Sequence, residues 1–361
     1  KGPWYLCPPP SPLSSACFGT VRRAAQCCRL KEVGEDEEWT VCWMDSLVSL
    51  DRIKEMKRFQ KINHFPGMME ICRKDLLARN LNRMLKLFPR DYNIFPRTWC
   101  LPAEARARGT RRFDAGDGCL HSPLHLCRPL RWSTGSTLVA EGRGRVQVTV
   151  LTGIQLDVNH HRIPQALGQK PIFLYKEGLA RFATMKYIDP SSTKVEDICM
   201  HLTNYAINKR NENFIRDDTI GSKRKLSTMS AWMTANGYNT AKLWQDIEDV
   251  IIKTLIAAHP VVKHSYKSYF PNHTTVSACF EILGFDILLD SDLKPWLIEV
   301  NHSPSFSMDS QLDHEVKHAL LCDSINLINL LACNKRKAME EDREQARARL
   351  RQTCRTHSAS R

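Results

Sequence analysis

Two apolar runs near the end of the chain, residues 279–289 and 294–300, constrain its fold more than any other feature. They are separated by a short polar stretch, an arrangement that predicts a β-hairpin. Because side chains on a strand alternate between faces, Glu299 and Asn301 point the same way, and Asp286 on the preceding strand can approach them. The hairpin therefore predicts a cluster of two carboxylates and one carboxamide.

These three side chains offer only oxygen ligands, which suit Mg²⁺ better than zinc. The plainer interpretation is that Asp286 and Glu299 are charges on a solvated edge strand. However, both lie inside strongly apolar runs, FEILGFDILL and PWLIEVN, where an unpaired charge is costly. We therefore predict that Asp286, Glu299 and Asn301 are metal ligands, and that the metal bridges phosphate oxygens of a nucleotide.

The charge of the chain narrows the choice of partner. Its 361 residues carry a formal net charge of +13, which favours an acidic partner such as nucleic acid, anionic lipid or an acidic protein surface. The sequence has neither zinc-finger spacing nor an RNA-binding signature. No apolar run reaches the roughly 18 residues of a membrane-spanning helix. The 14 cysteines are irregularly spaced, which is typical of a cytosolic protein with reduced thiols.

Composition divides the chain into five segments. Three of them do not have the composition of a globular domain. They are a proline-rich start expected to be disordered, an arginine-rich and aperiodic middle, and a basic tail. In order, the segments are 1–19 (disordered start), 20–102 (N-terminal lobe), 103–170 (aberrant segment), 171–333 (C-terminal lobe) and 334–361 (basic tail). The tail is either a solvated helix or disordered end, or an electrostatic clamp for an acidic surface.

Periodicity gives a coarse picture of the secondary structure inside the lobes. Helices are predicted at 75–87, 241–258 and 315–330, and further strands at 39–43, 145–151, 171–175 and 180–183. Both lobes therefore contain a mixture of strands and helices.

Three other polar stretches are candidates for binding. MHLTNYAIN at 200–208 gathers hydrogen-bonding side chains, and GSKRKLS at 221–227 is a basic loop beside a glycine. A satisfied turn and solvated lysines are the plainer interpretations of these two. In EGLARFAT at 177–184, Arg181 lies between apolar neighbours, so it needs a carboxylate or phosphate partner, either structural or a substrate.

Six motifs in this order resemble the tubulin–tyrosine-ligase-like family, and in particular its glutamate-adding branch, the tubulin polyglutamylases. They are KINHFPGMMEICRKDLLARNL, FPRTWCLP, EGLARFAT, HLTNYAIN, GSKRKLS and GFDILL…PWLIEVNHSPSF. The resemblance covers residues 21–102 and 171–339, about two-thirds of the chain. It implies an α/β (α+β) fold with an ATP-grasp-type ligase core, in which ATP and Mg²⁺ lie between two α/β lobes.

The resemblance also implies roles for single residues. It makes Asp286, Glu299 and Asn301 the Mg²⁺ ligands, in agreement with the hairpin, and it makes Arg181 and Glu299 the residues on which catalysis depends. The implied binding residues are Thr203 and Asn204 for the nucleotide, Arg181, Tyr205 and Lys223 for free glutamate, His302 near the acceptor carboxylate, and Lys317 as a further charge for the amino acid.

The implied reaction follows from the chemistry of carboxylates. A carboxylate is a poor electrophile, so ATP must first convert it into an acyl phosphate, which the amine of free glutamate then attacks. The implied acceptor is a glutamate in the acidic C-terminal tails of tubulin, which accounts for the net charge without nucleic acid or membrane. The implied setting is the cytoplasm and the microtubule cytoskeleton, with the cilium, axoneme or basal body as a family setting.

Segment 103–170 departs from the family pattern. The family has a lysine-led glycine-rich loop, a glutamine-containing strand and a K-F-D-x-R strand here, whereas this chain has only EGRGRVQVT at 141–149 and VNHHR at 158–162. We interpret the segment as a gene-model or splice artefact, with a degenerate paralogue or a diverged loop as alternatives. The chain as written is expected to have weak or no activity.

The alternative functions are a catalytically impaired microtubule-binding paralogue, a truncated or mis-spliced product, and a sister ligase that adds glycine or tyrosine. Arg181 together with Lys223 favours glutamate, because two cations suit its extra carboxylate.

Overall fold

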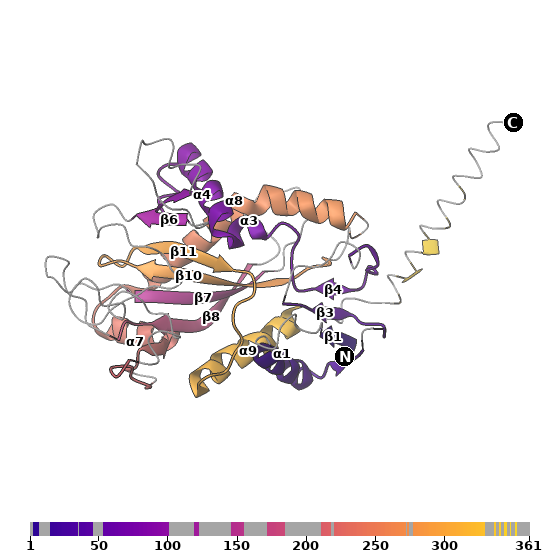
Figure 1. The fold of residues 1–361 in the computed structure, drawn as a ribbon, viewed down its shortest axis with the longest axis horizontal. Coiled ribbons are helices and arrows are strands. Elements are labelled where there is room, and N and C mark those ends of the chain that lie inside the picture. Colours follow the sequence, from indigo (N-terminus) through magenta and orange to yellow (C-terminus); the bar gives the residue numbers. More distant parts are fainter. Residues whose placement is uncertain are drawn as a thin grey trace, which may run out of the picture.

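In the computed structural model the described residues are 3–6, 15–34, 36–45, 53–100, 119–122, 146–154, 172–184, 211–217, 220–271, 273, 277–328 and seven single residues between 336 and 351. A five-stranded antiparallel sheet lies at the centre of these residues, in the order β11-β10-β7-β8-β9 (Figure 1). Its strands are β7 (Val146–Ile154), β8 (Ile172–Arg181), β9 (Lys223–Lys225), β10 (Glu281–Leu289) and β11 (Pro295–Asn301).

The sheet confirms several of the predicted strands. The predicted hairpin is β10–β11, with β11 as an edge strand. The strand predicted at 145–151 is β7, which lies between β10 and β8 although it belongs to the segment expected to be aberrant. The two short strands predicted at 171–175 and 180–183 are one continuous strand, β8.

A smaller parallel sheet lies beside the main one. Its order is β2-β1-β3-β4, made of β1 (Pro3–Leu6), β2 (Lys31–Glu32), β3 (Val41–Trp43) and β4 (Lys61–Ile62). Ile62 forms a parallel bridge with Cys279, so the small sheet is joined to the start of β10. A separate ribbon pairs β5 (Arg97–Cys100) with β6 (Cys119–Ser122).

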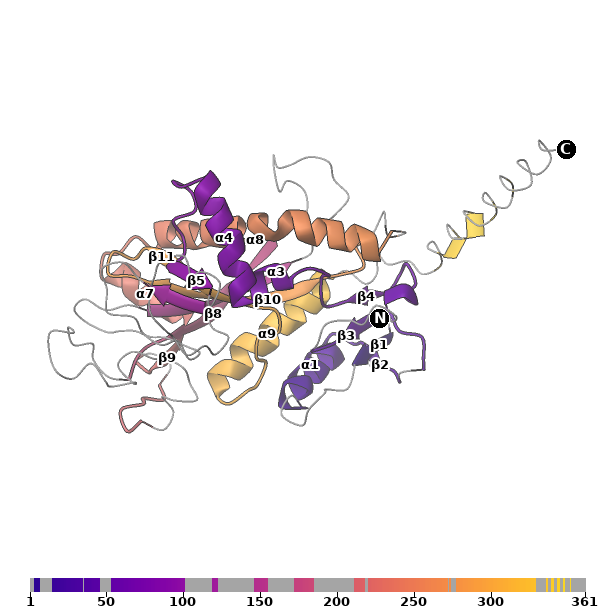
Figure 2. The same ribbon diagram turned by 45° about the horizontal axis from the view of Figure 1, so that its top comes forward.

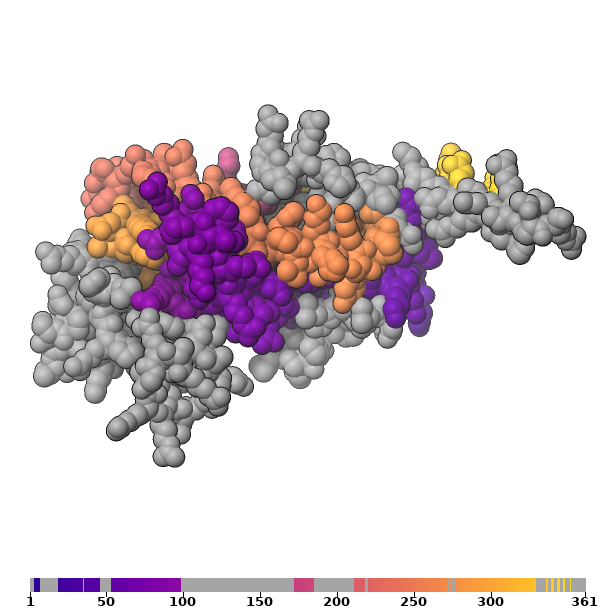
Figure 3. All heavy atoms as spheres, turned by 90° about the horizontal axis from the view of Figure 1, so that it is seen from above, coloured from indigo at the N-terminus to yellow at the C-terminus, as the bar shows by residue number. Residues whose placement is uncertain are grey.

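Helices cover both faces of the main sheet (Figure 2). On one face lie α3 (Met69–Cys72), α4 (Lys74–Leu87) and the long α8 (Thr240–Tyr269), and Figure 3 shows α4 and α8 next to each other on that surface. On the other face α1 (Ser15–Cys27) packs along α9 (Gln311–Leu327). Helix α7 (Leu226–Ala235) contacts β8 and β9, and its buried Leu226, Met229 and Met233 belong to the same core cluster as the buried residues of α8. These helices confirm the predictions at 75–87, 241–258 and 315–330, with later ends for α8 and an earlier start for α9. No helix in the described ranges is long and apolar enough to cross a membrane.

The alternation along β10 determines which side chains reach the candidate site. Leu283, Phe285 and Ile287 pack into the large core cluster with the buried residues of α8, whereas Ile282 packs with those of α1 and α9. Asp286 is four residues after Ile282 on the same strand, so its side chain points to the same face of the sheet, the face on which α9 lies. The pairing of β10 with β7 is regular throughout, so this assignment holds along the strand.

The prediction of disorder for 1–19 is wrong where the structure describes this segment. Residues 3–6 form β1, between β2 and β3, and α1 begins at Ser15. The physical reason is an apolar run: Trp4, Tyr5 and Leu6 are buried in the core. Most of the prolines of this segment come after the strand. The prediction of disorder rested on the composition of the whole segment, which does not reveal so short a strand.

Candidate functional site

The hairpin brings the predicted trio of oxygen ligands together. Asp286 lies directly opposite Glu299 in the register of β10 and β11, and only 6% of Asp286 is exposed. The Asn301 amide, two residues along β11, donates to Oε1 of Glu299 at 3.4 Å. The sequence prediction that these three side chains share one face is therefore confirmed.

Glu299 is held in its ionised form. Burial acts to raise its pKa, but the Lys74 ammonium, the Asp286 carboxyl and the Asn301 amide together lower the pKa below its ordinary value. An ionised carboxylate beside a second one needs a cation, and here the Lys74 Nζ provides it at 2.8 Å from Oε2. The all-oxygen donor set fits Mg²⁺. Among the described residues there is no group of three or more His, Cys, Asp or Glu side chains able to hold a metal, so such an ion would need Asn301, phosphate or water as further ligands.

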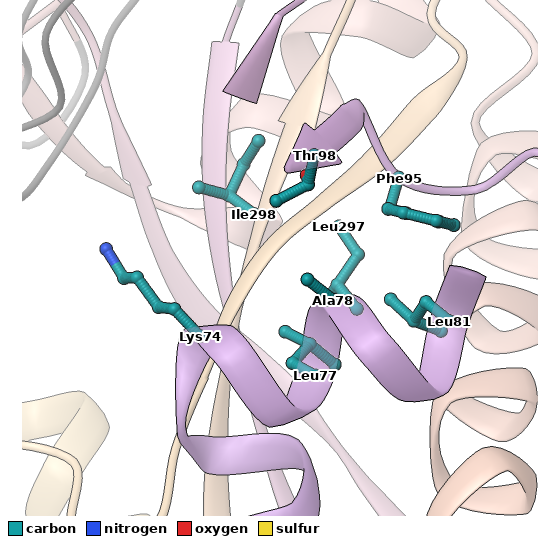
Figure 4. Close-up of a pocket in the computed structure, with 8 residues that line it drawn as sticks. All are labelled: Lys74, Leu77, Ala78, Leu81, Phe95, Thr98, Leu297 and Ile298. Carbon is teal, nitrogen blue, oxygen red and sulfur yellow. The ribbon is translucent and has the colours of Figure 1, made fainter. Parts of the chain in front are cut away.

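Lys74 is a candidate that the sequence analysis missed. It is the first residue of α4, and Figure 4 shows its ammonium extending away from a small, mainly apolar hollow where Leu77 and Ala78 face Leu297. Because β11 is an edge strand, a residue of α4 can reach the carboxylates from the side. Lys74 lies within the family motif KINHFPGMMEICRKDLLARNL, but its spacing gave no indication that it would meet Glu299, 225 residues later.

A second cluster lies toward the opposite edge of the same sheet and contains three cations and one carboxylate. Arg181 at the end of β8 is directly opposite Lys223 in β9. Asp313 in the first turn of α9 accepts from Lys223 at 2.5 Å and from Lys317 at 2.9 Å. Lys317 also donates to the Ser307 carbonyl at 2.7 Å. The structure therefore brings together three of the predicted substrate-binding residues.

This cationic cluster favours an added anion. Like charges directly opposite each other in a sheet repel, and Lys223 and Lys317 already share the carboxylate of Asp313. Burial lowers the pKa of Lys223, and Lys317 and Arg181 lower it further against the opposing effect of Asp313. The buried Nε of Arg181 has no hydrogen-bond partner among the described residues. A bound carboxylate would satisfy both the charge and this donor.

The two clusters face the same side of the sheet. Leu179 packs with Leu312 and Val316 of α9. Arg181 is two residues further along β8, so its side chain points to the same face. Arg181 pairs with residue 147 of β7, and Asp286 pairs with residue 149. Two strand spacings and two residues along β7 place their Cα atoms about 12 Å apart. At this separation the two clusters can bind different parts of the same substrate complex.

His302 lies beside a buried pair that joins His64 of the N-terminal lobe to Glu281 of β10. Its ring is 5.6 Å from that of His64, which contacts Oε1 of Glu281 through Nδ1 at 3.0 Å. Burial and the charge of His64 lower the pKa of His302, while Asp45 opposes them, so the ring is neutral at pH 7. Asp45 also accepts from the Ser303 hydroxyl at 2.7 Å, which ties the turn after β11 to the N-terminal lobe.

Three predicted residues, Thr203, Asn204 and Tyr205, lie outside the described residues. Asp313 was missed by the sequence analysis because its role depends on the fold. Its only local signal is the helix start at Ser310, whose hydroxyl accepts from the Asp313 N–H and donates to its carboxylate, a capping arrangement.

The ion pairs of Asp313 predict a dependence of stability on pH. Burial acts to raise its pKa, but Lys317 and Lys223 lower it below the ordinary value. A depressed pKa means that the stabilisation is present above the unfolded value of about 4 and is lost as pH falls through the folded value. We expect the free energy of unfolding of Asp313→Asn to change less between pH 5 and pH 3 than that of the parent chain, as measured by urea denaturation. An equal slope in both proteins would contradict this.

The chain is similar in sequence to proteins of one known family. A sequence model of the tubulin-tyrosine ligase family matches residues 52–114 and 169–337. The chain is 55% identical over 350 residues to tubulin polyglutamylase TTLL13 of Mus musculus and 54% identical over 361 residues to that of Homo sapiens, covering 94% and 97% of this chain. It is 51% identical over 355 residues to tubulin polyglutamylase TTLL6 of Homo sapiens. The chain spans 43%, 44% and 39% of these relatives' lengths.

Proposed function

Because this chain belongs to the tubulin-tyrosine ligase family, we propose that it is a tubulin polyglutamylase, an ATP-dependent ligase that joins free glutamate to glutamate side chains in the C-terminal tails of tubulin. The observation that carries the proposal is the presence of a carboxylate cluster and a cationic cluster on one face of one sheet. Relatives at 50–55% identity are tubulin polyglutamylases, in agreement with it.

Asp286, Glu299 and Asn301 form the cation end of the proposed site. When Mg²⁺ and ATP are bound, the metal neutralises phosphate charge during transfer to the acceptor carboxylate. These three side chains would hold that metal on the hairpin, and Lys74 adds a further positive charge beside Glu299. Their placement matters because positioning and electrostatics supply most of the rate in phosphoryl transfer.

Arg181, Lys223 and Lys317 form the amino-acid end. Free glutamate carries two carboxylates, and this cluster has an excess of two positive charges over Asp313, so the charges match. Arg181 has the free donor for a carboxylate. With both carboxylates held, the amine of glutamate is left to attack the activated carbonyl carbon. Glycine and tyrosine have one carboxylate each, so the cluster favours glutamate over these two amino acids.

Removing one cation tests the amino-acid end. We expect Lys223→Gln to raise the KM for glutamate by about 10- to 100-fold, because one charged hydrogen bond is lost, while the KM for ATP stays within twofold. Asp313 keeps Lys317 as a partner in this variant. Lys242→Gln is the control, since Lys242 pairs with Asp246 on the exposed surface of α8. Initial rates at varied glutamate measure the effect, and an equal change in both KM values would contradict this role.

The acceptor end is proposed to lie at His302. Its neutral ring follows Asn301 directly and faces the N-terminal lobe through His64. The net charge of +13 suits the acidic tubulin tail. Microtubules of the cytoplasm, including those of cilia, axonemes and basal bodies, are the proposed setting.

A second candidate function is a catalytically impaired protein that binds microtubules. It is favoured by the gap between the two matched regions of the family, residues 115–168, which includes most of the segment that lacks the expected nucleotide-binding motifs.

One assay separates the two functions. The 361-residue chain is incubated with microtubules, ATP, Mg²⁺ and labelled glutamate. The proposal predicts slow incorporation of label into tubulin that requires ATP and exceeds that of Glu299→Gln. Sedimentation with microtubules without incorporation above that background would favour the impaired protein.

A further inference from the structure

Three cysteines and two histidines gather between α1 and α9, away from both clusters of the proposed site. Cys27 is the last residue of α1 and Cys28 follows it, while His314, His318 and Cys322 lie on α9. The two helices pack along each other (Figure 1). Neither the proposed reaction nor the family resemblance assigns a role to this group.

Two of the thiols contact one another across the helix interface. The thiol of each of these residues meets the backbone of the opposite segment, and each thiol affects the pKa of the other. Cys28 Sγ also donates to the Cys322 carbonyl at 3.6 Å, and Cys322 Sγ lies 4.0 Å from the Ala24 carbonyl. Both cysteines are partly exposed, so a small molecule can reach them.

A proton acceptor lies beside the pair. Nδ1 of His318 is 3.8 Å from Cys322 Sγ, and its Nε2 is 3.8 Å from Sγ of the exposed Cys27. Burial and the neighbouring His314 and Arg23 lower the pKa of His318, so the ring is uncharged at neutral pH and able to accept a proton. In the described part of the chain no such Cys and His group has a geometry suited to a metal ion. The chemistry available to this group is therefore thiol–disulfide exchange.

We propose that Cys28 and Cys322 form a reversible disulfide by exchange with a low-molecular-weight disulfide such as glutathione disulfide. In the first step the Cys322 thiol gives its proton to His318, and its sulfur attacks the disulfide RSSR. One S–S bond breaks, a mixed disulfide forms on Cys322, and RS⁻ leaves and takes up the proton. Cys28 then attacks the Cys322 sulfur, and a second RSH leaves with the Cys28 proton. The thiol pair loses two electrons and RSSR gains them.

The rate of this exchange is set by thiol ionisation. Burial raises the pKa of Cys28, and burial together with Cys28 raises that of Cys322 to about 12. The thiolate is the attacking species, so exchange is slow at neutral pH and faster at higher pH. The pair thus stays reduced in brief contact with an oxidant and responds to prolonged oxidation.

The disulfide would join parts of the chain that are distant in sequence. Cys28 and Cys322 are 294 positions apart, and a link across so long a loop restricts the unfolded chain strongly. It would also hold α9, which carries Asp313 and Lys317, against α1.

The test uses the full chain with Cys27→Ser and Cys333→Ser, which leaves a single cysteine in each of the tryptic peptides 24–29 and 318–335. It is incubated for hours with glutathione disulfide at pH 8.5 and mapped by mass spectrometry without reduction. We expect the two peptides to be joined, dithiothreitol to separate them, and Tm to rise by about 4 °C or more. His318→Ala should slow the joining.

The matched control adds Cys322→Ser, in which the joined peptide and the rise in Tm should both be absent. Mixed disulfides with glutathione but no joined peptide in the folded chain would overturn the proposal. So would joining at the same rate in urea, because the pairing would then not depend on the packing of α1 against α9. Neither readout requires ligase activity.

Discussion

Glu299→Gln is expected to lower ATP-dependent glutamate transfer by at least about 10²-fold, the effect of removing one preorganised electrostatic group from an active site. The substitution keeps the shape of the side chain and removes the charge that the hairpin holds next to Asp286. Lys74 would lose its carboxylate partner, and the proposed metal would lose one of two anionic ligands. Asp286→Asn is expected to have a similar effect. Labelled glutamate incorporated into tubulin is the measure.

Asp292→Asn is the matched control for this prediction. Asp292 is an exposed acid in the turn of the same hairpin, and its backbone N–H donates to Asp290. Its substitution removes the same charge without touching the carboxylate pair, so activity should stay within twofold. Equal losses in the Asp292 and Glu299 variants would mean that the hairpin contributes only through its overall charge.

His64→Leu is expected to destabilise the fold by about 3–5 kcal/mol, the cost of leaving a buried charge without its partner. Only 3% of His64 and 1% of Glu281 is exposed. Glu281 accepts from the Phe65 backbone N–H through Oε2 and contacts His64 through Oε1. Nε2 of His64 lies 2.9 Å from the Met44 carbonyl and 3.3 Å from the Asn63 amide nitrogen, so both ring nitrogens have polar partners. Urea denaturation measures the loss.

The double variant His64→Leu with Glu281→Leu separates charge from packing. Replacing both partners by apolar side chains removes the uncompensated charge, so we expect most of the lost stability to return. His264→Leu is the control, since His264 is exposed on α8 and should change stability by less than about 0.5 kcal/mol. If the double variant is less stable than His64→Leu, the buried pair is not the source of the effect.

The contribution of His64 to the free energy of unfolding depends on pH. Burial acts to lower the pKa of His64, but contact with Glu281, the Met44 carbonyl and Asp45 raises it above the ordinary value. A raised folded pKa means that the stabilisation is fully present below the unfolded value of about 6.5 and is lost as pH rises through the folded value.

Local sequence patterns predict the parts of this site that lie within one element. Alternation was enough to place Glu299 and Asn301 on one face, and two apolar runs around a polar turn were enough to bring Asp286 opposite. The helix that contains Lys317 was likewise predicted from periodicity, although its start at Gln311, which brings Asp313 into the first turn, was not. Apolar neighbours marked Arg181 as a residue in need of an anion.

Contacts between distant segments were not predictable in this way. Lys74 meets Glu299, and His64 meets Glu281 and His302, only because α4 and the small sheet pack against the hairpin. No spacing in the sequence encodes those distances. Composition also failed at the start of the chain, where a four-residue buried strand, Pro3–Leu6, was hidden among prolines.

The interpretation of segment 103–170 as an artefact stays a prediction. Its described parts are β6 and β7, and β7 pairs along its length with β10. Strand pairing depends on the backbone and on the alternation of side chains, so it does not establish whether phosphate-binding groups are present.

The most direct test of a carboxylate–amine ligase follows an oxygen atom. An acidic tubulin-tail peptide carrying ¹⁸O in its glutamate carboxylates is incubated with the chain, ATP, Mg²⁺ and glutamate. If the acceptor carboxylate is activated as an acyl phosphate, its oxygen remains on the phosphorus when the amine displaces phosphate, so we predict one ¹⁸O in released phosphate for each bond formed. Bond formation with no ¹⁸O in the phosphate, detected by mass spectrometry, would contradict the proposed reaction.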